Sequence, residues 1–253
     1  MSDWNQAQAV PAGYADANVD PGLRKFMLGV FSKMALGLVW SAVLAYAVGS
    51  YEPLTRAVFT PPLLYVVQWG PLVLLLGSNF FMRNPSPASS GIFYWTIVTL
   101  MGAGLGIWVA LAVARVSATT IGGQELFVTF GGIAKAFFAT AAAFGGLALV
   151  GYTTKRNLTG LNNVLIMASW GLAAIAALSL FVRSSALEIG LEITSLVLFC
   201  GLVATQTNML RNTYYHFEND VRGQAVLTNL GALNLYIAFV AIFQNLLSMF
   251  SRR

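Results

Sequence analysis

Long apolar runs, most of them free of charge, are the feature that most constrains what this chain can fold into. Seven runs reach or exceed the length of a membrane span: Phe26–Gly49, Pro62–Phe81, Gly91–Ala114, Leu126–Tyr152, Leu161–Val182, Ser185–Leu210 and Gly231–Phe250. A helix needs roughly 20 apolar residues to cross a ~30 Å hydrocarbon layer. Backbone groups in lipid must be hydrogen-bonded internally, and a barrel would instead show short alternating segments. The runs therefore predict an all-α polytopic membrane protein with seven transmembrane helices.

The composition excludes several classes of protein. Only 9% of the residues are charged and 57% are hydrophobic, whereas soluble domains carry about 25% charged residues. The net charge of +5 is spread over short loops and forms no basic patch for nucleic acid. A single Cys and a single His rule out a disulfide framework and a tetrahedral zinc site. We expect no cofactor, no metal site and no soluble enzyme.

The first 22 residues differ from the rest of the chain. They are polar and contain several acidic residues, and they lack the basic start and apolar core of a signal peptide. We interpret residues 1–22 as a flexible tail and residues 23–253 as one transmembrane domain. The loops between the runs leave no room for a catalytic domain, and His216 has no nearby Cys or membrane-depth Ser with which to form a relay, so the chain is not expected to be an enzyme.

Lys and Arg predict the orientation, because cytoplasmic loops carry an excess of them. With the N-terminus inside, the inner segments hold Arg24, Lys25, Arg83, Lys155, Arg156, Arg211 and Arg222, and the outer loops hold Arg56, Arg115 and Arg183. This distribution favours a cytoplasmic N-terminus. Arg252 and Arg253 would then lie outside if all seven runs span, unless the seventh re-enters rather than crosses; the sequence leaves both alternatives open.

Four ionisable residues lie inside the apolar runs, where a charge is costly and usually has a partner or a function. Lys33 is about 10 Å into its helix, and its stem can reach the interface. Lys135 is roughly 13 Å, and Glu192 roughly 10 Å, into helices that begin on the same side. We therefore hypothesise a Lys135–Glu192 ion pair. Glu188, one turn nearer the surface, is expected to face water.

Two polar stripes run along the last two apolar runs. The sixth run carries Glu188, Glu192, Ser195 and Gln206, and the seventh carries Asn234, Ala238, Ala241 and Asn245. A polar stripe in lipid faces either a watery conduit or a partner helix. Lys135, Glu188 and Glu192 are the candidate conduit charges. Both interpretations, an ion path and hydrogen bonding between helices, remain open.

The segment Gly151–Leu158 (GYTTKRNL) closely resembles a segment of the Bax inhibitor-1 family, in its bacterial branch. The resemblance extends from about residue 23 to residue 250 and includes 23–27, 34–38, 134–145, 184–187, 212–214 and 231–236. It implies six helices around a central seventh, in a bacterial inner membrane. It also implies a slow, pH-sensitive calcium leak, with Ca²⁺ as the transported ion, a link to stress responses, and binding of a membrane-anchored protease as partner.

One departure from the family concerns its pH sensor, a pair of aspartates on the last two helices. Aligned on the flanking residues, this chain has Gln206 and Ala238 at those positions. Two close carboxylates share a proton, which makes such a pair a pH switch. Gln and Ala do not titrate and offer Ca²⁺ no carboxylate oxygen. We expect weak or absent pH gating, in either a residual cation leak or a non-conducting interaction protein.

Overall fold

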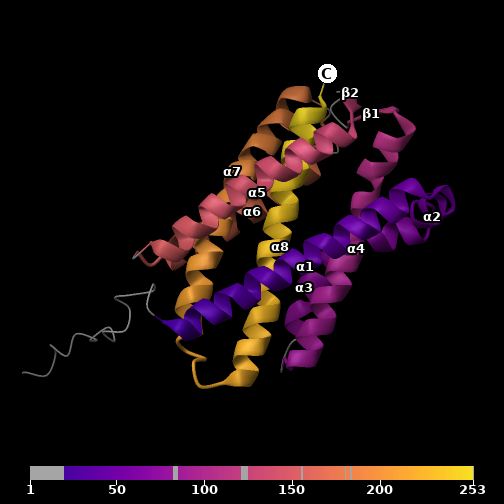
Figure 1. The fold of residues 1–253 in the computed structure, drawn as a ribbon. Coiled ribbons are helices and arrows are strands. Elements are labelled where there is room, and N and C mark those ends of the chain that lie inside the picture. Colours follow the sequence, from indigo (N-terminus) through magenta and orange to yellow (C-terminus); the bar gives the residue numbers. More distant parts are fainter. Residues whose placement is uncertain are drawn as a thin grey trace, which may run out of the picture.

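The computed structural model describes residues 20–81, 85–120, 125–154, 156–179, 181–182 and 184–252. The elements are α1 (Pro21–Ser50), α2 (Glu52–Val58), α3 (Leu63–Phe81), α4 (Pro87–Ala114), β1 (Ser117–Thr119), β2 (Glu125–Phe127), α5 (Phe130–Thr153), α6 (Thr159–Ser179), α7 (Ser185–Tyr214) and α8 (Val221–Ser251). The two short strands pair antiparallel between α4 and α5. The predicted all-α class is confirmed (Figure 1).

Each of the seven predicted runs overlaps a helix, although α8 begins at Val221, well before the run predicted from Gly231. Six helices are long and apolar enough to cross a membrane: α1, α4, α5, α6, α7 and α8. A seventh span is formed if α2 and α3 count together, with a 61° bend between them. The 31 residues of α8 form an unbroken helix of about 46 Å, which is long enough to cross a bilayer. The structure therefore favours a spanning seventh segment over a re-entrant one.

The first helix begins earlier than the sequence predicts. The Asp20 carboxylate accepts hydrogen bonds from the backbone N–H groups of Gly22 at 2.8 Å and Leu23 at 3.2 Å, and Pro21 stands at the first helical position. This capping arrangement satisfies N–H groups that a helix start leaves unpaired. Pro21 and Gly22 thus belong to α1 rather than to the predicted tail, whose residues 1–19 lie outside the described residues.

Helix α8 is the centre of the bundle. In its most apolar window 61% of the residues are buried, against 6–33% in the other five single-helix spans. Its main helical neighbours are α1, α4, α5 and α7, while α3 packs on α4 and α6 packs on α7 from outside. Figure 1 shows α8 running through the middle of the molecule. The predicted arrangement around a central seventh helix is confirmed, with α3 and α6 in an outer position.

Glycines allow the closest helix contacts. A Cβ on Gly102 of α4 would lie 2.8 Å from the Ser41 Cα of α1. On α5, a Cβ on Gly151 would collide with the backbone carbonyl of Ala204 on α7. Small residues at such crossings let helix backbones approach in lipid, where packing and not hydrophobicity drives association. The Gly of the GYTTKRNL segment therefore sets how closely α5 and α7 pack.

This contact yields a stability prediction. Gly151→Ala should lower the free energy of unfolding by about 1–3 kcal/mol, because the new methyl meets a backbone atom that cannot rotate away. Gly146→Ala on the same helix is the control, since a Cβ there has no neighbour within 4 Å. Thermal melts of both variants in detergent measure the difference. Equal melting temperatures for the two variants would contradict the close α5–α7 contact.

Candidate functional site

The densest polar cluster lies between the start of α7 and the end of α8. One carboxylate oxygen of Glu192, Oε2, forms an ion pair with Arg252 Nη2, and the two side chains are each 16% exposed. The other oxygen, Oε1, accepts a 2.7 Å hydrogen bond from Ser248 Oγ. One turn further along, Ser195 Oγ donates to Asn245 Oδ1 at 2.8 Å. We call Glu192, Ser195, Asn245, Ser248 and Arg252 the Glu192–Arg252 cluster.

The cluster shows how the two predicted polar stripes meet. Ser195 and Glu192 of α7 face Asn245 and Ser248 of α8, and the Asn245 amide also donates to the Ala241 carbonyl at 2.9 Å. Arg252 forms an antiparallel backbone bridge with Leu126 of β2, which attaches the end of α8 to the paired strands β1 and β2. In this half of the α7–α8 interface the stripes bond to each other, as helix-joining polar groups do.

The predicted Lys135–Glu192 ion pair is wrong. The partner of Glu192 is Arg252, and the Lys135 side chain is exposed on α5. The buried face of α5 instead contains Ala136, Thr140, Phe144, Ala148 and Gly151, at intervals of three or four residues. Lys135 lies beside that face, where its stem can run to the interface. Depth along a helix therefore did not predict the direction of the Lys135 side chain.

Glu188 also departs from its expectation of simply facing water. Its Oε2 accepts a 2.8 Å hydrogen bond from Thr120 Oγ1, which follows β1. The side chain is partly buried rather than exposed. Glu188 therefore attaches the first turn of α7 to the residue that follows strand β1, near the Glu192–Arg252 cluster.

The two positions predicted to replace the family's aspartates lie farther along α7 and α8 from the Glu192–Arg252 cluster. The Gln206 Oε1 atom is buried, and it has no hydrogen-bond partner in the described part of the chain. Ala238 is 2% exposed in the core. The pairing of Ser195 with Asn245, and the contact of Gly231 with Leu210, set the register of the antiparallel α7 and α8.

That register places Ala238 level with residues 202–203, about one helical turn from Gln206. In the described residues no buried carboxylate replaces the aspartate pair that the resemblance implies. Among the described residues the only buried charged side chain is Arg211, and no Asp or Glu is fully buried. Within the same residues, no group of three or more His, Cys, Asp and Glu could hold a metal ion. The centre of the described bundle therefore contains no acidic proton site.

A second polar cluster, at the end of the bundle where α1 begins, was missed by the sequence analysis. Lys33 Nζ donates to the Asn229 side-chain oxygen of α8 and lies 5.4 Å from the centre of the Tyr94 ring. The Asn229 amide donates to Ser90 Oγ at 2.7 Å and to the Pro87 carbonyl at 3.0 Å. Lys33 is thus held between α8 and α4 by an amide and a ring face. That its stem reaches the interface stays a prediction.

The GYTTKRNL segment is held by α7. Arg211 Nη1 donates to the Tyr152 carbonyl at 2.7 Å, and the Asn208 amide donates to the Gly151 carbonyl at 3.3 Å. Asn208 Oδ1 in turn accepts from the Leu158 N–H at 3.1 Å. A cation is favourable at a helix C-terminus, where carbonyls lack partners. Arg211 and Asn208 therefore fix the end of α5 and the turn into α6.

The Glu192–Arg252 assignment can be tested by a double-mutant cycle. Glu192→Gln and Arg252→Gln should couple by about 1 kcal/mol, because each partner is mostly shielded from water. Glu192→Gln and Lys135→Gln form the control cycle and should be additive within about 0.5 kcal/mol. Unfolding of the detergent-solubilised protein measures all the free energies. Coupling to Lys135 but not to Arg252 would overturn the assignment.

Comparison with known proteins agrees with this architecture. The family described as inhibitor of apoptosis-promoting Bax1 matches residues 23–253. An uncharacterised protein of Caulobacter vibrioides is 44% identical over 99% of this chain and 98% of its own. The uncharacterised protein RP147 of Rickettsia prowazekii is 30% identical, over 92% of each chain. The inner membrane protein YbhL of Escherichia coli is 26% identical over 94% of this chain and 97% of its own. The chain is an integral, multi-pass membrane protein that belongs to the Bax inhibitor-1 family.

Proposed function

We propose that this protein is a slow cation leak of the Bax inhibitor-1 type, with Ca²⁺ as the transported ion and without strong pH gating. The proposal places it in a bacterial inner membrane with a cytoplasmic N-terminus, as the Lys and Arg distribution favours. The observation that carries it is the Glu192–Arg252 cluster. It is a carboxylate and several hydroxyl and amide groups on the interface between the central helix and α7.

The chemistry of the cluster fits a gate for a hard cation. Carboxylate, amide and hydroxyl oxygens are ligands that Ca²⁺ accepts. In the structure Arg252 neutralises Glu192, and Ser248 and Asn245 are bonded to α7, so the interface is closed. Separation of Arg252 from Glu192 would expose these oxygens to an entering ion. Because several bonds must break together, the open state is rare and the leak is slow.

The residues Gln206 and Ala238 explain why pH should have little effect on the rate of the leak. Gln206 and Ala238 have no proton to exchange between about pH 6 and pH 8. The charged group that faces Glu192 in the described residues is Arg252, and Tyr236 is the titratable residue nearest Ala238 along α8. A shared proton of the kind that an aspartate pair holds has no site here.

The pH prediction is tested in liposomes that contain the purified protein and a calcium dye. The initial rate of Ca²⁺ entry should change by less than about two-fold between pH 6 and pH 8, since neither Gln nor Ala titrates. Protein-free liposomes measure the background, and an ionophore confirms that the dye responds at each pH. A steep, acid-inhibited leak would contradict the proposal of lost gating.

The gate is tested by Arg252→Gln in the same liposomes. Loss of about 1 kcal/mol of closing free energy raises a rare open population roughly five-fold, and the Ca²⁺ entry rate should rise in proportion. Arg56→Gln is the matched control, because it breaks the Glu52–Arg56 ion pair, whose side chains are 78% and 73% exposed on α2. An equal rise in both variants would mean that Arg252 holds no gate.

A second candidate is a non-conducting protein that holds a membrane partner, such as a membrane-anchored protease. The observation that favours it is the closed α7–α8 interface, together with the absence of a buried carboxylate in the described residues. No Ca²⁺ entry above background in the wild-type protein and in Arg252→Gln would favour this candidate over the leak. Co-purification of a protease from gently solubilised membranes would then support it.

A further inference from the structure

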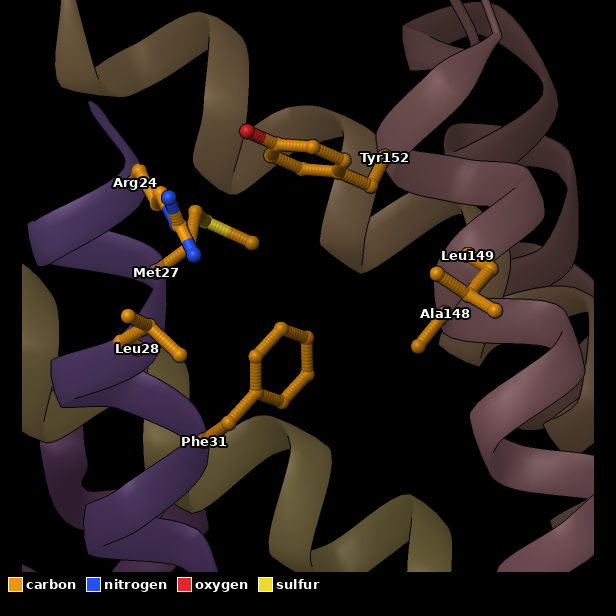
Figure 2. A pocket seen from close by; sticks show the side chains of 7 residues that line it. All are labelled: Arg24, Met27, Leu28, Phe31, Ala148, Leu149 and Tyr152. Atoms are coloured by element: carbon orange, nitrogen blue, oxygen red, sulfur yellow. The ribbon is translucent and has the colours of Figure 1, made fainter. Parts of the chain in front are cut away.

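A pocket of about 340 Å³ lies between α1 and α5, away from the Glu192–Arg252 cluster. Its lining residues come from the first three turns of α1 and the last two turns of α5: Arg24, Met27, Leu28, Phe31, Ala148, Leu149 and Tyr152. Figure 2 shows the two helices facing each other across it. Leu28 and Leu149 are 56% and 65% exposed, so the pocket opens on the surface that faces lipid.

The pocket is polar at one end and apolar at the other. Figure 2 shows Arg24 on the α1 wall and Tyr152 on the opposite α5 wall toward one end, and Leu28 and Phe31 toward the other. Arg24 is in the first turn of α1 and Tyr152 is in the last turn of α5, so both are at the interface level of the bundle. Leu28 and Phe31 lie about 6 Å and 10 Å deeper along α1. The polarity therefore runs from the interface into the membrane, as it does along a phospholipid.

Arg24 is positively charged, and the nearby Asp20 carboxylate caps the start of α1. No carboxylate of the described residues forms an ion pair with Arg24. The adjacent Lys25, which does not line the pocket, adds a second positive charge at the same level. A guanidinium binds a phosphate through two parallel hydrogen bonds, which gives it an advantage over an ammonium. Positive residues at this depth attract anionic lipid headgroups.

We propose that this pocket binds an anionic glycerophospholipid. The phosphate would contact Arg24, with the Tyr152 hydroxyl beside it. One acyl chain would lie against Leu28, Phe31 and Ala148. A lipid is favoured over a soluble phosphate because most of the lining is apolar and opens to the bilayer. A bound lipid would pack α1 against α5, two helices that both contact central α8.

Native mass spectrometry of the detergent-solubilised full chain tests the proposal. Phosphatidylglycerol and phosphatidylcholine with identical acyl chains are added in equal amounts. The wild-type protein should retain phosphatidylglycerol with at least about five-fold preference. Arg24→Gln should bring the two lipids to near parity. Lys25→Gln also removes one positive charge, but from the adjacent residue outside the pocket. This variant should keep most of the preference for phosphatidylglycerol.

Two more measurements distinguish a lipid site from a soluble-phosphate site and from diffuse attraction to the positive charges. Ala148→Phe fills the apolar end without changing a charge, and should weaken retention of phosphatidylglycerol in protein that keeps its melting temperature. If that variant does not fold, Leu149→Ala is used instead. It shortens an exposed side chain on the same wall, and it should also weaken retention of phosphatidylglycerol. Glycerol 3-phosphate at millimolar concentration should fail to displace the lipid. Displacement by this soluble headgroup, or equal losses in Arg24→Gln and Lys25→Gln, would overturn the proposal.

Discussion

The rest of the structure depends on a central helix that carries no charge after Arg222. No charged residue occurs between Gly223 and Ser251, which allows α8 to lie buried among four neighbours. A buried helix in lipid must still pair its polar side chains, because neither lipid nor core offers a partner. Asn229 is paired with Lys33 and Ser90, Tyr236 with Ser41, and Ser248 with Glu192. These bonds fix the rotation of α8 about its own axis.

Charged residues hold both ends of the α7–α8 interface. At the end where α5 stops, Arg211 bonds to a backbone carbonyl; at the end where α8 stops, Arg252 pairs with Glu192. A charge at the middle of the layer would cost several kcal/mol. A charge close to the end of a helix costs less, because interfacial water or backbone carbonyl dipoles lie nearby. Helices α7 and α8 are thus held by charge at both ends and by packing between them.

The sequence predicted the segments well and the contacts poorly. Run length and apolarity depend on the thickness of the bilayer alone, so the seven segments and their approximate bounds could be read directly. The partner of Glu192 depended on the direction of its side chain and on where the last helix ends, and neither follows from depth. Asn229 was missed because a single amide in an apolar run gives no local signal of the lysine it meets 196 residues away. The family resemblance supplied the central position of α8, which periodicity alone could not.

The replacement of the family's aspartates by Gln206 and Ala238, as the resemblance predicts it, would have a physical consequence for the core. An aspartate pair at that depth would be costly to bury and would hold a proton, so that the state of the bundle would follow pH. Ala238 removes that cost and packs in the core, and Gln206 retains only a neutral oxygen. An unpaired buried amide oxygen costs about 1–3 kcal/mol, which the surrounding packing must offset. On the proposed function, control of the α7–α8 interface lies where Glu192, Arg252 and Ser248 meet, and it depends on an ion pair instead of a shared proton.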